Sequence, residues 1–468
     1  MRRESGGRQK AGEQHQGQRQ DGQPFAGRPP GRGPVLRRRD GRFRIFPVKR
    51  QIRGPGHGTR RNTPFPAAGT RRAPPCARPR NGMGFPPCGK ITVGLFAPHS
   101  HFTPFRLRTH SKFSRWEGAN VRIGILAPVT WRTPPRKYGP WEQVCANLAD
   151  GLAERGHEVY LFATGDSVTR ARLESVCPVP LGEHPELPSR PWELIHIGFA
   201  LERADRLELD VLHNHMNYLT LPFARLIRTP VVTPLHGAAL LEADSRAAYR
   251  QFPGMPYISI SYAEREGCPE LNYIANVYNG IRLEQFDFVD RPGEYLLFIG
   301  RICPDKGADL AVELARRTGL PLVIAGLVPG GEEAFFAEKI RPWIDDKQIR
   351  FVGEVGPVER NRLMGGALAL LHLVRAPEPF GLVMAEAMAC GTPVIGFGRG
   401  SVPEVVEHGR TGFVVSTLEE AAACVGRLSD IRRRDCRERV ERLFTVERMV
   451  AGYEEAYRSL LSSSVNPS

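Results

Sequence analysis

From residue 121 onward, short apolar runs of strand length alternate with segments of helical period, and this pattern restarts after residues 291–293. Repeated strand–helix–strand units of this length predict parallel sheets that are covered by helices on both faces. We therefore predict an α/β fold with two doubly wound, Rossmann-like domains, at 121–286 and 287–444, which face each other across a cleft. An amphipathic helix at 445–462 is expected to follow them.

The elements of the two domains can be placed from their apolar periods. The expected strands lie at 121–127, 158–163, 210–213, 230–234, 257–261 and 273–277 in the first domain, and at 294–300, 322–325, 349–352, 367–374 and 393–396 in the second. The expected helices lie at 140–155, 308–318, 357–366 and 382–389. Ligands of such folds bind outside the carboxyl ends of the strands, often between domains, so the loops after these strands are the places to look for function.

The positive charge of the chain is confined to its first quarter. The formal net charge is +15, a value typical of proteins that bind nucleic acids. Residues 1–120 contain 26 Lys and Arg against 5 Asp and Glu, a net charge of +21, whereas the remainder carries −6. The α/β region therefore needs no polyanionic partner, and we expect no nucleic acid to bind to it.

Residues 1–120 are rich in Arg, Pro and Gly and sustain neither a strand period nor a helical one. Such a composition buries too little apolar surface to offset chain entropy, so we expect disorder through about residue 118. Three interpretations stay open: a tail that binds RNA or a membrane surface, a targeting segment, or a segment that is not part of the mature protein. The third has a specific motive, because Val121 opens the first strand and a valine can mark an alternative GTG start codon.

Two further features bear on the compartment. No run approaches the ~18 consecutive apolar residues of a membrane-spanning helix. The nine cysteines include no Cys-x-x-Cys pair, which argues against a disulfide framework and a zinc ribbon and fits a reducing environment. We therefore expect a cytoplasmic protein, with peripheral membrane contact left open.

The most informative stretch contains two glutamates eight residues apart, Glu378 and Glu386. Glu378 follows a predicted strand, and Glu386 lies about one turn into the next predicted helix. The backbone amides of Phe380, Gly381 and Leu382 open that helix, and free amides at a helix start favour an anion or a hydroxyl-rich ligand. Both glutamates are therefore candidate binding residues, and the alternative is that they are solvated surface charges.

Two more candidate groups follow other predicted strands. Arg301 and Lys306 lie five residues apart in a loop between a strand and a helix. This pair of cations suits a diphosphate, because arginine binds bidentately and lysine acts as a point charge. His236 lies at the end of a strand in the first domain, where its side chain would face the cleft. The alternatives are ordinary loop charges and a structural histidine.

Several other site types fail on inspection. The chain has no Asp-x-Asp pair, the usual carboxylate cradle for a divalent metal and a nucleotide, and no Gly-x-Gly-x-x-Gly. Residues 84–90 imitate a P-loop, but Ile91 replaces the Ser or Thr and two prolines remove amides that the loop needs. His213 and His215 could be read as a metal pair, but no nearby carboxylate or third histidine supports it. We expect neither a metal nor a cofactor.

Taken together, these residues resemble the GT-B retaining glycosyltransferases of family 4, the glycosyl transferases group 1. The resemblance rests on the Glu-x7-Glu pattern, the Gly-Arg-x4-Lys-Gly of residues 300–307, the cleft-facing histidine and residues 277–286, which are similar to the family's entry to the interdomain linker. It covers about residues 121–462 and none of the first 120. The final helix resembles the one that crosses back to the first domain in that family.

The resemblance implies roles for the candidates in the second domain. Glu386 would hydrogen-bond the ribose of a nucleotide-diphosphate-sugar donor. Glu378, with the amides of residues 380–382, would hold hydroxyls of the transferred sugar. Arg301 and Lys306 would bind the diphosphate, and the family needs no metal for this step.

The first domain departs from the family pattern at its phosphate loop. His236 would contact the sugar near the reacting carbon, and Gly139 would approach the phosphates. The family usually has two adjacent glycines there, whereas this chain has Gly139 followed by Pro140, and proline supplies no amide. Trp141 and Glu142 would instead shape the acceptor side.

We therefore predict a metal-independent, retaining, hexosyltransferase-like enzyme of carbohydrate biosynthesis that moves a sugar from a nucleotide-diphosphate-sugar to an acceptor. The acceptor stays open among a saccharide, a lipid-linked molecule and another small molecule. Two alternatives also stay open. One is a nucleotide-sugar epimerase on the same frame, which would convert the donor alone into an isomer. The other is a catalytically degenerate protein that binds sugar nucleotides.

Overall fold

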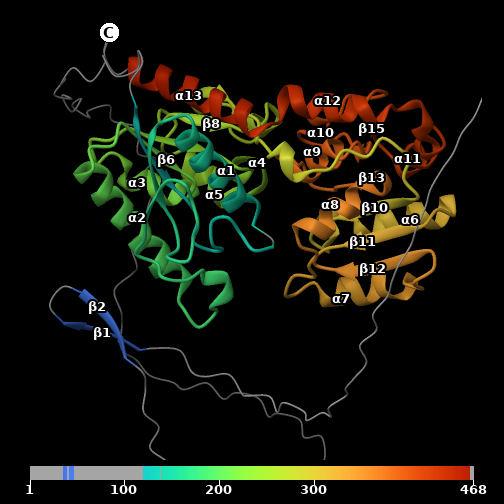
Figure 1. Cartoon of the computed structure of the whole chain (residues 1–468), viewed down its shortest axis with the longest axis horizontal. Coiled ribbons are helices and arrows are strands. Elements are labelled where there is room, and N and C mark those ends of the chain that lie inside the picture. The colour runs from blue at the N-terminus through green and yellow to red at the C-terminus, as the bar shows by residue number, and fades with distance from the viewer. Residues whose placement is uncertain (1–34, 40–41, 47–119, 138, 464–468) are drawn as a thin grey trace, which may run out of the picture. The chain divides into compact units, whose positions relative to one another are not determined.

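The computed structural model describes residues 35–39, 42–46, 120–137 and 139–463 (Figure 1). Contacts along the chain divide it into two compact units, Met1–His99 and Ser100–Ser468, and each is described by itself.

The first unit contributes one described feature, a hairpin in which β1 (Val35–Arg39) pairs antiparallel with β2 (Arg42–Phe46). These ten residues belong to the segment 1–118 for which we expect disorder, and Val, Leu, Phe and Ile in the two short runs favour extended backbone. The average composition of the whole segment hides that local preference. The rest of the segment expected to be disordered lies outside the described residues.

The second unit begins with a parallel sheet of seven strands in the order β5-β4-β3-β6-β7-β8-β9. The strands are β3 (Arg122–Leu126), β4 (Glu158–Phe162), β5 (Arg172–Glu174), β6 (Val211–Asn214), β7 (Val231–Pro234), β8 (Tyr257–Ser259) and β9 (Tyr273–Asn276). Six of them lie on predicted apolar runs, with ends that differ by at most two residues. The sequence did not indicate β5, because this three-residue edge strand is largely exposed and lacks an apolar run.

Helices cover both faces of this first sheet. They are α1 (Pro140–Glu154), α2 (Ser189–Arg206), α3 (Leu221–Ala224), α4 (Ala238–Leu241) and α5 (Ala243–Tyr249). Successive residues of a strand point to opposite faces, and β4 shows this clearly. Leu161 packs in the cluster that contains α1, whereas Phe162 packs in the cluster that contains α2.

The second sheet has six parallel strands in the order β12-β11-β10-β13-β14-β15. The strands are β10 (Tyr295–Ile299), β11 (Leu322–Ala325), β12 (Ile349–Gly353), β13 (Ala367–His372), β14 (Val394–Phe397) and β15 (Gly412–Val415). The associated helices are α6 (Ala308–Thr318), α7 (Glu333–Phe335), α8 (Pro357–Gly365), α9 (Leu382–Ala389), α10 (Val402–Val405), α11 (Leu418–Val425) and α12 (Arg433–Leu443). Both sheets are therefore doubly wound and parallel, as predicted.

The last helix, α13 (Val446–Ser463), follows α12 but packs into the core of the first sheet. Figure 1 shows it in red beside the teal α1, although the two helices are far apart in the sequence. Val450, Tyr453 and Tyr457 are buried in one cluster with Val144 and Leu148 of α1. The core of the first sheet is therefore completed by the C-terminal end of the chain.

Side chains and loops also join the two sheets near their carboxyl ends. The Ser261 hydroxyl donates to the carbonyl oxygen of Pro379 over 2.6 Å. The Glu404 carboxylate accepts hydrogen bonds from the backbone amides of Tyr262 at 2.9 Å and Ala263 at 2.7 Å. The contact of Ser261 with Pro379 brings the loop that contains Glu378 next to the loop that follows β8.

Candidate active site

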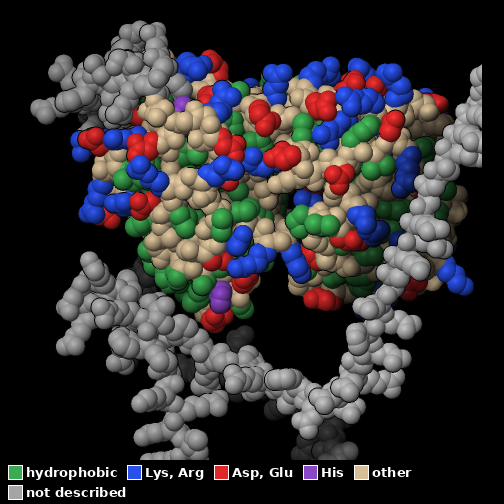
Figure 2. All heavy atoms as spheres, viewed as in Figure 1, with side chains coloured by type: hydrophobic (Ala, Val, Ile, Leu, Met, Phe, Trp, Pro, Cys, Tyr) green, Lys and Arg blue, Asp and Glu red, His purple; other side chains and the backbone are tan. Residues whose placement is uncertain are grey.

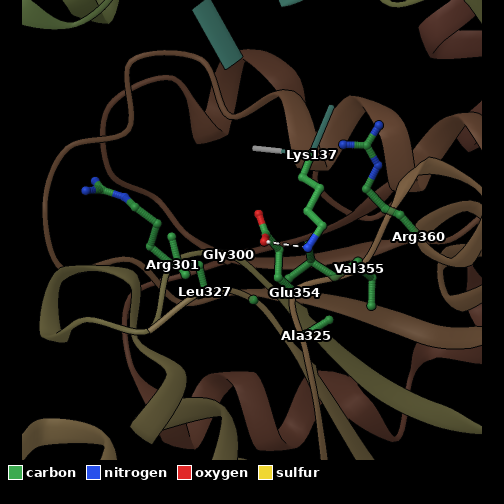
Figure 3. A pocket seen from close by; sticks show the side chains of 10 residues that line it. Lys137, Gly300, Arg301, Ala325, Leu327, Glu354, Val355 and Arg360 are labelled. Carbon is green, nitrogen blue, oxygen red and sulfur yellow. Dashed lines mark ion pairs between the residues drawn. The ribbon is translucent and has the colours of Figure 1, made fainter. Parts of the chain in front are cut away.

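A pocket opens at the carboxyl ends of the first strands of the second sheet. Its wall is formed by residues after β10, β11 and β12, by α8 and by one residue of the loop before α1 (Figure 3). The lining residues are Lys137, Ile299, Gly300, Arg301, Ala325, Gly326, Leu327, Glu354, Val355 and Arg360. On the face shown in Figure 2, Lys and Arg side chains flank the hollow between the two halves of this unit.

The floor of the pocket depends on a close approach of two backbones. Gly326 has a φ of 157°, and a Cβ added to it would lie 1.8 Å from the carbonyl oxygen of Gly300. Only glycine fits at such a distance. The loops after β10 and β11 therefore meet without side chains between them, which leaves room for a ligand above.

Three cations and one carboxylate line this pocket, and they come from different elements. Arg301 follows β10, Arg360 belongs to α8, and Lys137 reaches in from the loop before α1. The ammonium of Lys137 lies 3.4 Å from a carboxylate oxygen of Glu354. Lys137 is exposed, and such ion pairs are weak, so an anionic ligand can displace Glu354 at little cost.

Glu378 does not line that pocket, and its carboxylate contacts two basic side chains. Its Oε2 atom lies 2.7 Å from Nζ of Lys306 and 3.2 Å from Nε2 of His372. Burial alone would raise the pKa of Glu378, but contact with His372 and the charge of Lys306 outweigh burial and hold this pKa at about 2. The structure thus pairs Lys306 with Glu378, whereas the resemblance gave Lys306 to the diphosphate and Glu378 to the sugar.

The start of α9 lies directly after Glu378 and depends on Gly381. Gly381 has a φ of 76°, and a Cβ added to it would lie 2.5 Å from Cε of Met384 and 3.1 Å from Cγ of Glu378. The first amides of α9, beginning with that of Leu382, have no acceptor within their own helix. The Phe380 side chain is buried in the hydrophobic core, so its backbone is the part that remains for a ligand.

Glu386 is buried in the second turn of α9, and its Oε1 atom lies 3.4 Å from the guanidinium of Arg360. Arg360 also lines the pocket, so this contact connects the second glutamate of the Glu-x7-Glu pattern to the same cavity as Arg301. The structure therefore brings Arg301 and Glu386 to one place, with Arg360 between them.

His236 follows β7 and is buried next to Trp141 in the first turn of α1. Its backbone has a φ of 48°, its Nε2 atom lies 2.7 Å from Nδ1 of His215, and its ring centroid lies 5.8 Å from that of Trp141. Burial lowers the pKa of His236 to about 4. A Cβ added to the next residue, Gly237, would lie 2.4 Å from Cγ of Pro379, so the His236 loop and the Glu378 loop are in direct contact.

Glu264, which the sequence analysis did not single out, holds the His236 loop in place. Its two carboxylate oxygens accept hydrogen bonds from the backbone amides of Gly237 and Ile260, the latter at 2.8 Å. Its side chain is fully buried. Burial raises the pKa of Glu264 to about 7, although the two amides oppose this shift.

This raised pKa predicts that the protein loses stability as the pH rises. The folded state keeps the proton of Glu264 up to about pH 7, whereas the ordinary pKa of a glutamate, which applies to the unfolded chain, is 4.5. Binding of this proton therefore stabilises the folded state fully below pH 4.5, and the stabilisation is lost as the pH rises from 4.5 to 7. This difference between the folded and unfolded pKa of Glu264 corresponds to about 3 kcal/mol in the free energy of unfolding. Glu264→Gln should therefore flatten the unfolding free energy measured by urea denaturation between pH 4.5 and 8. Glu266→Gln, an exposed change in the same segment, is the control, and an unchanged pH dependence in Glu264→Gln would contradict the prediction.

The predicted phosphate loop is tightly folded against α1. Gly139 has a φ of 154°, and a Cβ added to it would lie 2.7 Å from Cβ of Pro135. The buried carboxyl of Glu142 accepts a hydrogen bond from the amide of Trp131 over 3.2 Å, and burial raises the pKa of Glu142 to about 7. Glu142 therefore fixes this loop from inside, while Trp141 is the residue that packs beside His236.

Two kinds of feature do not occur among residues that the structure describes. No group of three or more His, Cys, Asp or Glu side chains there is arranged to hold a metal ion. Nor does any helix there have the length and apolar character needed to cross a membrane.

Sequence comparisons assign the chain to a family. Residues 284–441 match the model described as glycosyl transferases group 1, and residues 141–284 match glycosyltransferase family 4. A D-inositol 3-phosphate glycosyltransferase of Acidothermus cellulolyticus is 33% identical over an alignment of 347 positions, and this alignment covers 61% of this chain and 77% of the relative. The chain belongs to the group 1 glycosyltransferases. Another relative of this glycosyltransferase is the N-acetyl-alpha-D-glucosaminyl L-malate synthase of Bacillus anthracis, which is 27% identical. The alignment covers 69% of this chain and 94% of the relative.

Solved structures agree with the GT-B architecture of this glycosyltransferase. A glycosyltransferase involved in avilamycin A biosynthesis is 26% identical, with a TM-score of 0.54 over 73% of this chain and 98% of that one. The sucrose-phosphate synthase of Thermosynechococcus elongatus is 18% identical, with a TM-score of 0.61 over 74% of this chain and all of that one. The second likeness concerns the fold alone.

Several residues of this site escaped the sequence analysis. Arg360 and Glu354 carry no local motif, and each becomes relevant only because α8 and the end of β12 meet at the pocket. His215 was considered only as a metal ligand, and Glu264 not at all.

Proposed function

We propose that this glycosyltransferase transfers a sugar, with retention of configuration and without a metal ion, from a nucleoside-diphosphate sugar to an acceptor hydroxyl. The observation that carries the proposal is the pocket, which three cations (Arg301, Arg360 and Lys137) line together with a single carboxylate, that of Glu354. A diphosphate bears the opposite charge and matches the bidentate geometry of arginine. The relatives named above support transfer of a sugar, since their names describe glycosyl transfer or its products.

The proposed chemistry follows from where charge develops. Breaking the bond between the sugar and the diphosphate places negative charge on the leaving group, and preorganised cations and amides stabilise it. Each charge-assisted hydrogen bond contributes about 1.5–3 kcal/mol. Arg301 and the first amides of α9 would therefore supply a large share of the at least ~8 kcal/mol that an enzyme must find.

The sugar would lie where the loops of Glu378 and His236 touch. Glu378 stays ionised at neutral pH, because its pKa is about 2, and an ionised carboxylate accepts hydrogen bonds from sugar hydroxyls. The acceptor hydroxyl would attack from the face that the diphosphate leaves, and the departing diphosphate would take its proton. Retention of the anomeric configuration follows from that geometry.

Lys137 offers an explanation for the unusual Gly139-Pro140 pair. Pro140 cannot donate an amide hydrogen bond to a phosphate, but Lys137, three residues earlier, already reaches into the pocket. A phosphate that displaces Glu354 from Lys137 would gain a charged contact from the first half of the enzyme. We include Lys137 in the proposed donor site for this reason.

Binding of the nucleotide is the first expectation to test, by thermal unfolding of the full chain with UDP, GDP, ADP or dTDP, each with and without EDTA. UDP comes first, because structures of Anabaena Alr3699/HepE, 18–19% identical to this chain, contain UDP or UDP-glucose. At about 100 times its dissociation constant, a ligand stabilises the folded state by about 2.7 kcal/mol, which raises the melting temperature measurably.

The matching nucleoside without phosphates serves as the control, since it lacks the group that the cations would bind. We expect one nucleotide to stabilise the protein and its nucleoside to do so much less. Stabilisation by none of the four nucleotides would contradict the proposal, and stabilisation that EDTA abolishes would contradict its metal-independent form.

A further inference from the structure

Three histidines of the first sheet form a buried column. His213 belongs to β6, His215 follows it, and His236 follows the neighbouring strand β7. The ring centroids of His213 and His215 lie 4.4 Å apart, and those of His215 and His236 lie 4.8 Å apart, with interplanar angles of 17° and 24°. All three side chains are buried, so the rings contact one another rather than water.

The three rings are neutral at ordinary pH. Burial lowers the pKa of each imidazole, and the pKa of His236 falls to about 4. A neutral imidazole carries one proton, on either Nδ1 or Nε2, so one nitrogen donates and the other accepts. The direction of the hydrogen bond between His215 and His236 therefore decides which nitrogen of each of these two rings bears its proton.

The hydrogen bond between His215 and His236 can run in either of two directions. Nδ1 of His215 lies 2.7 Å from Nε2 of His236, so one of these atoms must donate to the other. The other nitrogen of His215, Nε2, is buried and has no hydrogen-bond partner among the described residues. A proton on that atom would create an orphaned buried N–H group, which is rarer in proteins than an acceptor without a partner.

The favoured arrangement therefore puts the proton of His215 on Nδ1, which donates to Nε2 of His236. Nε2 of His236 must then be an acceptor, and the single proton of His236 lies on Nδ1. This Nδ1 atom has no partner among the described residues, yet it is not one of the buried polar atoms sealed from solvent. His236 thus presents an N–H donor where a ligand can reach it.

We propose that His215 is a positioning residue that fixes the tautomer of His236, so that Nδ1–H of His236 donates a hydrogen bond to a sugar oxygen of the donor. This inference rests on the proposed function. It assigns a direction to the hydrogen bond between His236 and the sugar: Nδ1 of His236 is the donor and the sugar oxygen is the acceptor. His215 itself touches no substrate and acts through the orientation and protonation of the next ring.

Two nearly isosteric variants separate this role from a packing role. In His215→Asn, the side-chain amide can still donate to Nε2 of His236, whereas the carboxylate of His215→Asp can only accept. The aspartate would force the proton of His236 onto Nε2. We expect kcat to remain within about 3-fold in the asparagine variant and to fall by about 10²-fold or more in the aspartate variant, as for other catalytic histidines in the wrong tautomer. The KM for the donor should change little in both.

The tautomer itself is measured by long-range ¹H–¹⁵N correlation spectra of the full chain labelled at histidine, with His236→Asn used to assign the signals. We expect the Nδ1–H form of His236 in the wild-type protein and in His215→Asn. The spectrum of the wild-type protein suffices for the test even where His215→Asp fails to fold.

An Nε2–H form of His236 in the wild-type protein would overturn the inference, as would equal losses of kcat in the asparagine and aspartate variants. These outcomes are distinct from failure of the proposed function, which would appear as absence of nucleotide binding or sugar transfer in the wild-type protein.

Discussion

Replacing Arg301 by alanine should reduce sugar transfer by about 10²- to 10³-fold while the protein remains folded. Arg301 lines the pocket and lies opposite Lys137 and Arg360, where a leaving diphosphate would gain negative charge. Its side chain is exposed, so its removal leaves the core intact. The measurement is kcat/KM with the donor that the nucleotide screen identifies, together with the melting temperature of the variant.

Arg206→Ala is the matched control for the loss of one positive charge. Arg206 lies in the last turn of α2, is exposed and pairs with Glu202 at 2.6 Å, a type of surface ion pair that contributes little. Transfer should be unchanged in this variant. Full activity in Arg301→Ala would refute the role of Arg301, whereas a parallel loss in both variants would indicate a non-specific effect of charge.

Replacing Tyr457 by alanine should lower the free energy of unfolding by about 3–5 kcal/mol, the usual cost of truncating a large buried side chain. Tyr457 belongs to α13 but is fully buried in the core of the first sheet, and its hydroxyl lies 2.5 Å from Nδ1 of His213. Urea denaturation followed by circular dichroism measures the effect.

Two further variants show which part of Tyr457 matters. Tyr457→Phe keeps the ring and leaves Nδ1 of His213 without its partner, so we expect a smaller loss of about 1–3 kcal/mol. Glu455→Ala changes an exposed residue of the same helix and should have almost no effect. A loss of less than 1 kcal/mol in Tyr457→Ala would mean that α13 contributes little to the first half.

The sequence predicted the elements whose apolar period is strong. The bounds of α6, α9 and β11 agree with the prediction at both ends. α12 was not predicted, because its sequence RRDCRERVERL is dominated by charge. It is nevertheless buried in part: Arg433 donates hydrogen bonds to the carbonyl oxygens of Val289 at 2.6 Å and Ala367 at 2.9 Å. A sequence read alone cannot show that carbonyls from distant loops satisfy an arginine.

The candidate site was predictable where its residues share a local motif and hidden where they meet across the fold. Glu378, Glu386 and Arg301 follow strands and are found from that position. The pairing of Lys306 with Glu378 depends on β13 lying beside β10, and the contact of His215 with His236 depends on β6 lying beside β7. Strand order, which sets both contacts, leaves no trace in a single sequence.

The path of α13 has a consequence for how the protein is made. The last strand of the first sheet, β9, ends at Asn276, and α13 begins about 170 residues later. At a synthesis rate of 5–20 residues per second, the first half waits on the order of 10–30 s on the ribosome with the apolar face of α1 uncovered. The nascent chain therefore exposes an apolar surface throughout the translation of its second half. Chaperones that bind such surfaces would have their longest opportunity during that interval.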